Sequence, residues 1–140
     1  MGIWRQRLHE ELSGQVQYEI TGKMPGINEI VQAGKNPRAR NAMKKRAENS
    51  AVAQMRAQGL REVTQFPVVV TFDWRAKNRR RDPDNIAGAG QKILLDALQV
   101  AGILPNDGWS QIARIEHNFE ISGAQDAVTI TITEHSPAID

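Results

Sequence analysis

Cysteine is absent from this sequence of 140 residues, and aromatic residues make up only 5% of it. The lack of cysteine excludes disulfide bonds and thiolate metal sites, and it fits a reducing cytoplasm. No run of about 18 apolar residues is present, so no segment is expected to span a membrane. Hydrophobic residues nevertheless make up 40% of the chain, which is enough for the core of one domain.

The formal net charge is only +2, but the charges are unevenly distributed. Lysine and arginine concentrate in residues 35–61 and again in residues 75–81. A small total charge with local basic patches is typical of proteins that bind nucleic acid, although such runs also occur on solvated helix faces. The second patch directly precedes the most informative motif of the chain.

The periodicity of apolar residues predicts an α/β (α+β) fold. Alternation predicts strands at residues 15–21, 66–74, 112–121 and 127–133, and helical spacing predicts helices at residues 39–59 and 85–101. This order favours a small mixed β-sheet of about four strands with two main helices. We place a single domain at residues 14–140 and treat residues 1–13 as an N-terminal extension.

The segment Arg81–Asn85, with the sequence RDPDN, carries the clearest chemistry. Pro83 favours an extended backbone at Asp82, so Asp82 and Asp84 are expected to point their carboxylates the same way just before a helix. Two close carboxylates repel each other unless a cation lies between them, and oxygen ligands suit Mg²⁺, with Mn²⁺ as the alternative. Helix capping by Asp84 or Asn85 is the other interpretation.

A third acid would strengthen such a metal site. Asp107 is the main candidate, although an Asp-Gly pair is also typical of a turn, and Asp96 is a weaker one. A calcium-binding EF-hand loop is excluded, because Ala87 and Ile93 occupy the positions where that loop requires glycine and glutamate.

Together these segments resemble the core of the RusA family of Holliday junction resolvases. The resemblance covers about residues 66–116, and it rests on the run Arg80–Asn85, a helix with Lys92 and Asp96–Leu98, then Gly102 and Asp107 before a strand. It implies a RusA-like homodimer that cuts four-way DNA junctions in recombination and repair as a Mg²⁺-dependent endodeoxyribonuclease. Such proteins act in the bacterial cytoplasm and are often encoded by phages.

The resemblance also implies roles for individual residues. The catalytic acids and metal ligands of the family correspond to Asp82, Asp84 and Asp107. The catalytic lysine usually lies four residues after the second acid, where this chain has Gly88. Lys92, one helical turn later on the same face, is the expected substitute, and its other interpretation is a surface residue paired with Asp96.

The basic loop is predicted to bind the DNA backbone, because cations offset the repulsion between acids and phosphates. Its candidate DNA-binding residues are Arg75, Lys77, Arg79, Arg80 and Arg81. Such contacts carry no sequence code, so selectivity for a junction would come from shape. A nuclease of broader flap or fork specificity and a non-catalytic DNA-binding module are the alternatives.

Three further side chains are ambiguous in the sequence. Trp74 and Trp109 flank the acids in the sequence. Each could stack on an exposed base or simply pack within the fold. His117 lies on an otherwise apolar strand face, and we interpret it as a hydrogen-bonded core histidine rather than a base.

Overall fold

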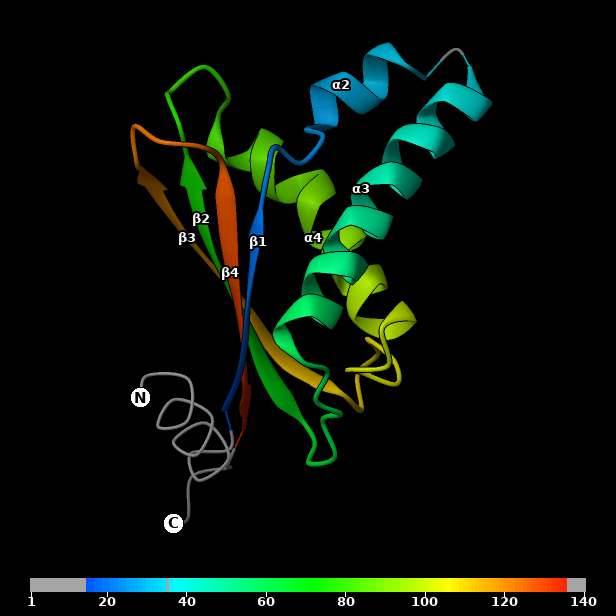
Figure 1. Ribbon diagram of the computed structural model, residues 1–140, viewed down its shortest axis with the longest axis vertical. Helices are drawn as coiled ribbons and strands as arrows, with labels where there is room; N and C mark the ends of the chain where they lie inside the picture. Colours follow the sequence, from blue (N-terminus) through cyan, green and yellow to red (C-terminus); the bar gives the residue numbers. More distant parts are fainter. Residues whose placement is uncertain (1–14, 35, 136–140) are drawn as a thin grey trace.

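The computed structural model describes residues 15–34 and 36–135, so the predicted N-terminal extension lies outside the described residues. A four-stranded sheet is covered on one face by helices (Figure 1). The strands are β1 (Gln15–Thr21), β2 (Val68–Ala76), β3 (Ile112–Ile121) and β4 (Ala127–Glu134), and the helices are α2 (Ile27–Gln32), α3 (Pro37–Gln58) and α4 (Pro83–Val100). The expected α/β class and the two main helices are confirmed.

The sheet has the strand order β1-β4-β2-β3 and is mixed, as expected. β4 runs antiparallel to both of its neighbours, whereas β2 and β3 run parallel. A parallel pair needs a long crossover connection, and α4 is that connection. The carboxyl ends of β2 and β3 therefore lie at the same end of the sheet, next to the start of α4.

Alternation along the strands separates the two faces of the sheet. The apolar residues of β2 predicted to share a face, Val68, Val70, Phe72 and Trp74, are each at most 4% exposed and face the helices. The matching residues of β4, Val128, Ile130 and Ile132, are buried in the same core. Phe66, predicted as the first residue of the β2 strand, lies before it and is 38% exposed.

Helix α3 spans Pro37–Gln58, close to the predicted range of residues 39–59. The side chain of Asn36 accepts hydrogen bonds from the backbone of Arg38 and Ala39, and Pro37 occupies the first turn. Gly59 ends the helix with a φ of 96°, in the region that favours glycine. The buried residues of α3, at positions 51, 52 and 55, lie in its second half, which packs near β1 and α4.

Two glutamines of α3 hydrogen-bond to the outer edge of β1. Gln54 binds both backbone groups of Thr21, at 2.8 and 3.0 Å. Gln58 binds both backbone groups of Glu19, at 2.9 and 2.6 Å. These contacts occupy donors and acceptors that an edge strand would otherwise expose.

Helix α2 lies in a part of the chain where the sequence predicts no helix. The helix begins at Ile27, whose side chain lies directly against Gly88 of α4. The buried Asn85 accepts a hydrogen bond from the backbone of Asn28 at 2.8 Å. This short helix, which has no fully buried residue, is therefore stabilised by contacts with α4 that local periodicity does not reveal.

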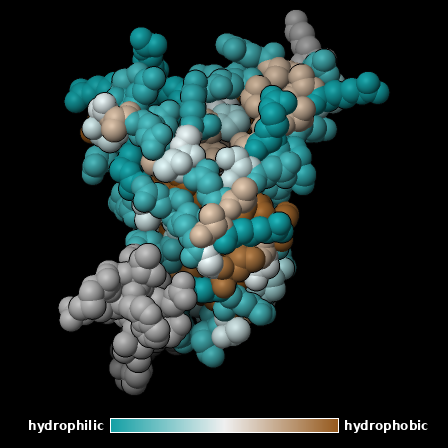
Figure 2. Space-filling model, in the orientation of Figure 1, coloured by the Kyte–Doolittle hydropathy of each residue, from teal (hydrophilic) through white to brown (hydrophobic). Residues whose placement is uncertain are grey.

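The surface is consistent with this layered fold. Figure 2 shows that the face seen in the orientation of Figure 1 is largely hydrophilic, with hydrophobic residues gathered in smaller patches. In the part of the chain that the structure describes, no helix has both the length and the apolar character needed to cross a membrane.

Candidate functional site

The two acids of the RDPDN segment lie at the N-terminus of α4. Asp82 is the N-cap residue, and its backbone is extended, with φ −73° and ψ 153°, as Pro83 predicts. Its side chain makes no capping hydrogen bond, and Asp84 follows in the first helical turn. Both residues are exposed, and the positive end of the helix dipole favours negative charge at this position. Their carboxylates can therefore receive a cation from solvent.

The interpretation of Asp84 or Asn85 as the helix cap is wrong, because the N-cap is Asp82. Asn85 is only 8% exposed, and its side-chain oxygen is bound to the backbone of Asn28. Its role in the segment is to connect α4 to the start of α2.

Lys92 lies farther along α4, between two other acids. Its ammonium nitrogen is 3.1 Å from a carboxylate oxygen of Asp96 and 3.7 Å from one of Asp107. The hydrogen bond to Asp96, followed by the charges of Asp96 and Asp107, raises the pKa of Lys92 above its ordinary value. The residue therefore carries a positive charge at neutral pH and can stabilise negative charge, but it cannot act as a general base.

The three predicted metal ligands do not meet in one place. Within residues 15–34 and 36–135, no three histidine, aspartate or glutamate side chains come together as a metal site of that kind requires. Asp107 contacts the Lys92 ammonium instead of the acids at the start of α4. Asp82 and Asp84 alone still fit Mg²⁺, which commonly uses one or two carboxylates and completes its shell with water and substrate phosphate.

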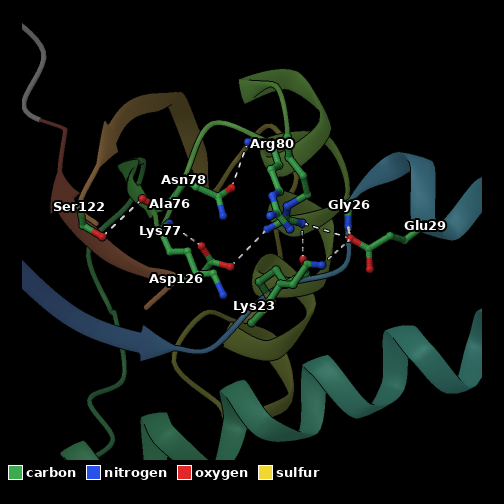
Figure 3. Close-up of polar contacts among 11 residues, drawn as sticks. Lys23, Gly26, Glu29, Ala76, Lys77, Asn78, Arg80, Ser122 and Asp126 are labelled. Carbon is green, nitrogen blue, oxygen red and sulfur yellow. Dashed lines mark hydrogen bonds and ion pairs between the residues drawn. The ribbon is translucent and has the colours of Figure 1, made fainter. Parts of the chain in front are cut away.

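The basic loop contributes two kinds of arginine. Arg81 binds the carbonyl oxygen of Met24 at 2.7 Å and forms ion pairs with Glu29 at 3.4 Å and Asp126 at 3.8 Å. Figure 3 shows the surrounding network, which connects the loop to α2 and to the turn before β4. Arg75 points to the other face of the sheet, where it pairs with Glu19 and Thr129. Both arginines are thus engaged within the fold.

The remaining cations of the loop, Lys77, Arg79 and Arg80, are exposed. Two hydrogen bonds from the backbone shape the loop around them: Lys77 donates to Asp126 at 2.8 Å, and Arg80 donates to Asn78 at 3.0 Å (Figure 3). No ion pair with another described residue neutralises their side chains. They form an uncompensated positive rim beside Asp82.

A groove of about 340 Å³ opens between this rim, α4 and β3. Its lining includes Arg79 and Asp82 together with the apolar residues Trp74, Pro83, Ile86, Phe119 and Ile121. It lies at the carboxyl ends of the two parallel strands, the position where α/β sheets commonly bind ligands. No protein-family model matches this chain, and a search of curated proteins finds no match either.

The sequence interpretation missed Phe119 and Ile121 as site residues, because alternation along β3 assigns them to the core face. They are 44% and 49% exposed, and they lie at the end of an edge strand. Their position at the end of the strand predicted at residues 112–121 was the only sequence feature that could have indicated this.

Trp74 is a core residue, whereas His117 is half-buried at the edge of the core and is hydrogen-bonded, as we interpreted. The indole nitrogen of Trp74 donates to Nδ1 of His117 at 2.9 Å, so Nε2 carries the proton and donates to Gln91 at 2.7 Å. Burial lowers the pKa of His117, which keeps the ring neutral. Trp109, by contrast, is 100% exposed, so its side chain does not pack within the fold.

Proposed function

We propose that this chain is a Mg²⁺-dependent endodeoxyribonuclease that cuts branched DNA, with the Holliday junction as its substrate. The proposal is supported by the exposed carboxylates of Asp82 and Asp84, of which Asp82 makes no capping hydrogen bond. They lie beside the exposed, unpaired cations Lys77, Arg79 and Arg80. Acids that hold a metal and cations that hold phosphates are the two components that phosphodiester hydrolysis requires.

The residues of the chain divide this work between them. Bound Mg²⁺ would activate water for attack and neutralise charge on the phosphate. Asp82 and Asp84 would hold the metal, and the rim cations would orient the DNA backbone. Lys92 would stabilise charge that develops on the scissile phosphate. Asp107, which contacts the Lys92 ammonium at 3.7 Å, would have to change conformation to join these acids.

A non-catalytic DNA-binding module is the second candidate. The observation in its favour is that the described residues contain no three-acid cluster. In that case the rim cations would bind DNA and the acids would only stabilise the helix terminus. Binding would then be independent of divalent metal, and no strand would be cut.

The deciding experiment offers synthetic DNA substrates with Mg²⁺, Mn²⁺ or EDTA. A four-way junction, a flap, a fork and a linear duplex separate strict junction cutting from broader specificity. We expect metal-dependent cutting of the junction, and no cutting of linear duplex. Binding of all substrates without any metal-dependent cleavage would contradict the proposal and support the binding module.

Variants of the acids test their roles in the same assay. Asp82→Asn, Asp84→Asn and Asp107→Asn should each abolish cleavage while junction binding persists, because a neutral amide is a poor Mg²⁺ ligand. Asp73→Asn is the matched control, since this acid lies on the other face of the sheet, bonded to Asn118. Full activity in any of the three variants would remove that residue from the site.

A further inference from the structure

The groove at the carboxyl ends of β2 and β3 contains an exposed aromatic ring. Phe119 is 44% exposed and lines the groove with Pro83 and Ile86 of α4. An exposed phenylalanine gains little from the fold, so its position in a groove indicates a surface for a flat apolar ligand.

The ring of Phe119 lies beside another aromatic ring of β3. It lies nearly parallel to His117, at 18° with 6.2 Å between ring centroids. His117 is in turn nearly parallel to Phe72 and Trp74, and hydrogen bonds to Trp74 and Gln91 hold it on both sides. Phe119 is thus the outer end of an aromatic layer that extends from the core to the surface.

The same groove also contains a cation and a candidate catalytic acid. Arg79 is exposed and unpaired with any described residue, and Asp82 forms part of the same lining. A flat ring next to a cation is the combination with which proteins bind an unstacked nucleotide, the ring contacting the base and the cation its phosphate.

We propose that this groove holds a nucleobase displaced from the base stack at a DNA branch point, with Phe119 as its platform and Arg79 on its phosphate. This proposal rests on the proposed function. It adds a contact that a branched substrate can make and a linear duplex cannot. Bases in a linear duplex are stacked and paired, whereas a branch point releases one at lower cost. Phosphate contacts follow the shape of the DNA backbone, and the groove would add a contact with a base.

The test measures binding in EDTA, where no strand is cut. The probe is a four-way junction with the fluorescent adenine analogue 2-aminopurine at the branch point, compared with a linear duplex that contains the same base. Phe119→Leu keeps an apolar side chain but removes the flat ring. We expect it to weaken junction binding by about tenfold to a hundredfold, the usual effect of removing one base–aromatic stack. Duplex affinity should be unchanged, and the fluorescence change on junction binding should disappear.

Two further variants isolate the role of the ring. Phe119→Tyr retains a flat ring and should keep both the affinity and the fluorescence change. Phe66→Leu removes another exposed phenylalanine, 38% exposed and outside the groove, and should behave as the wild type. Thermal unfolding of each variant shows whether the fold is intact, and Phe119→Tyr keeps the test decisive if Phe119→Leu is unstable.

Failure of the groove proposal and failure of the proposed function give different results. If wild type cuts junctions with Mg²⁺ but Phe119→Leu binds them as tightly as wild type does, the groove proposal is wrong and the proposed function stands. If wild type neither binds nor cuts branched DNA, both fail. If Phe119→Leu instead separates a dimer into monomers, measured by light scattering, the groove is an interface between copies and the nucleobase proposal is overturned.

Discussion

Lys92 forms ion pairs with acids from two separate segments. It pairs with Asp96 as a helix neighbour, and it also contacts Asp107, the acid that the resemblance places at the catalytic site. The position where the family usually has its lysine is Gly88, and a Cβ atom there would overlap the side chain of Ile27. A larger residue at Gly88 would therefore require the end of the Ile27 side chain to shift.

Replacing Lys92 tests its catalytic role. Lys92→Ala should lower the single-turnover cleavage rate by about a hundredfold, the usual effect of removing one preorganised charge-stabilising group. Stability should hardly change, because the side chain is 69% exposed and alanine favours the helix. Lys45→Ala is the matched control, since Lys45 is 63% exposed and forms a similar pair with Glu48 on α3. If Lys92→Ala cuts at the wild-type rate, Lys92 has no catalytic role and only pairs with Asp96.

A rescue follows from the contact between Ile27 and Gly88. Gly88→Lys in the Lys92→Ala background should restore part of the activity, and Ile27→Ala should increase the recovery, because it removes the side chain that a Cβ atom at Gly88 would meet. No recovery in either background would mean that a lysine on this face of α4 does not act on the scissile phosphate.

His117 makes stability depend on pH in a predictable direction. Burial lowers its pKa in the folded state, so folding favours the neutral ring. The stabilisation is complete above the ordinary pKa of about 6.5 and is lost as the pH falls through that value toward the lowered one. His117→Gln should therefore show a smaller drop in Tm than wild type between about pH 8 and about pH 5. His135→Gln is the control and should keep the wild-type drop; an equal drop in both variants would refute the assignment.

At the scale of the elements, local rules predicted most of the secondary structure. Alternation in β2 and β4 and the capping pattern of α3 depend on neighbouring residues, so the sequence alone identifies them. The extended backbone of Asp82 is equally local, since it follows from Pro83. The contacts of Ile27 with Gly88 and of Lys92 with Asp107 are not local, because the packing of separate segments creates them. For this reason α2 and the division of the acids into separate groups could not be predicted.

The basic loop gives a prediction that separates DNA contacts from structural contacts. Arg79→Ala with Arg80→Ala should weaken DNA binding and lower the slope of log K against log salt by about 0.9 for each phosphate that the protein no longer neutralises. Folding should be unaffected, because both side chains are exposed. Arg81→Ala is the contrasting variant. It should lower the free energy of unfolding by roughly 1.5–3 kcal/mol, because it removes a charged hydrogen bond to Met24 from a side chain only 17% exposed.

Titration of DNA at several salt concentrations and urea unfolding provide the two readouts for these variants. An unchanged salt slope in the double variant would mean that the loop does not touch DNA. A wild-type unfolding curve for Arg81→Ala would mean that its contacts with α2 and the turn before β4 contribute nothing to stability.

At the scale of the whole molecule, the groove, the positive rim and the two exposed acids lie at one end of the sheet, whereas Lys92 lies farther along α4 and Asp107 precedes β3. The helices cover one face of the sheet (Figure 1). The other face carries polar pairs such as Arg75 with Glu19 and Asn118 with Asp73. The crossover through α4 brings the carboxyl ends of β2 and β3, the positive rim and the two exposed acids together. Each chain therefore carries one candidate site, so a single copy could cut only one strand of a symmetric junction at a time.

A junction has two strands to cut, so we expect the active form to be a homodimer with two-fold symmetry. Light scattering at micromolar concentration should give twice the protomer mass of 15.6 kDa. Mixed dimers of wild type and Asp82→Asn sharpen the prediction, because each would contain one intact site. On a supercoiled plasmid with an extruded cruciform, wild type should make paired cuts and yield linear product, whereas mixed dimers should yield nicked circles. A monomer that makes paired cuts, or mixed dimers that still linearise the plasmid, would contradict the two-site arrangement.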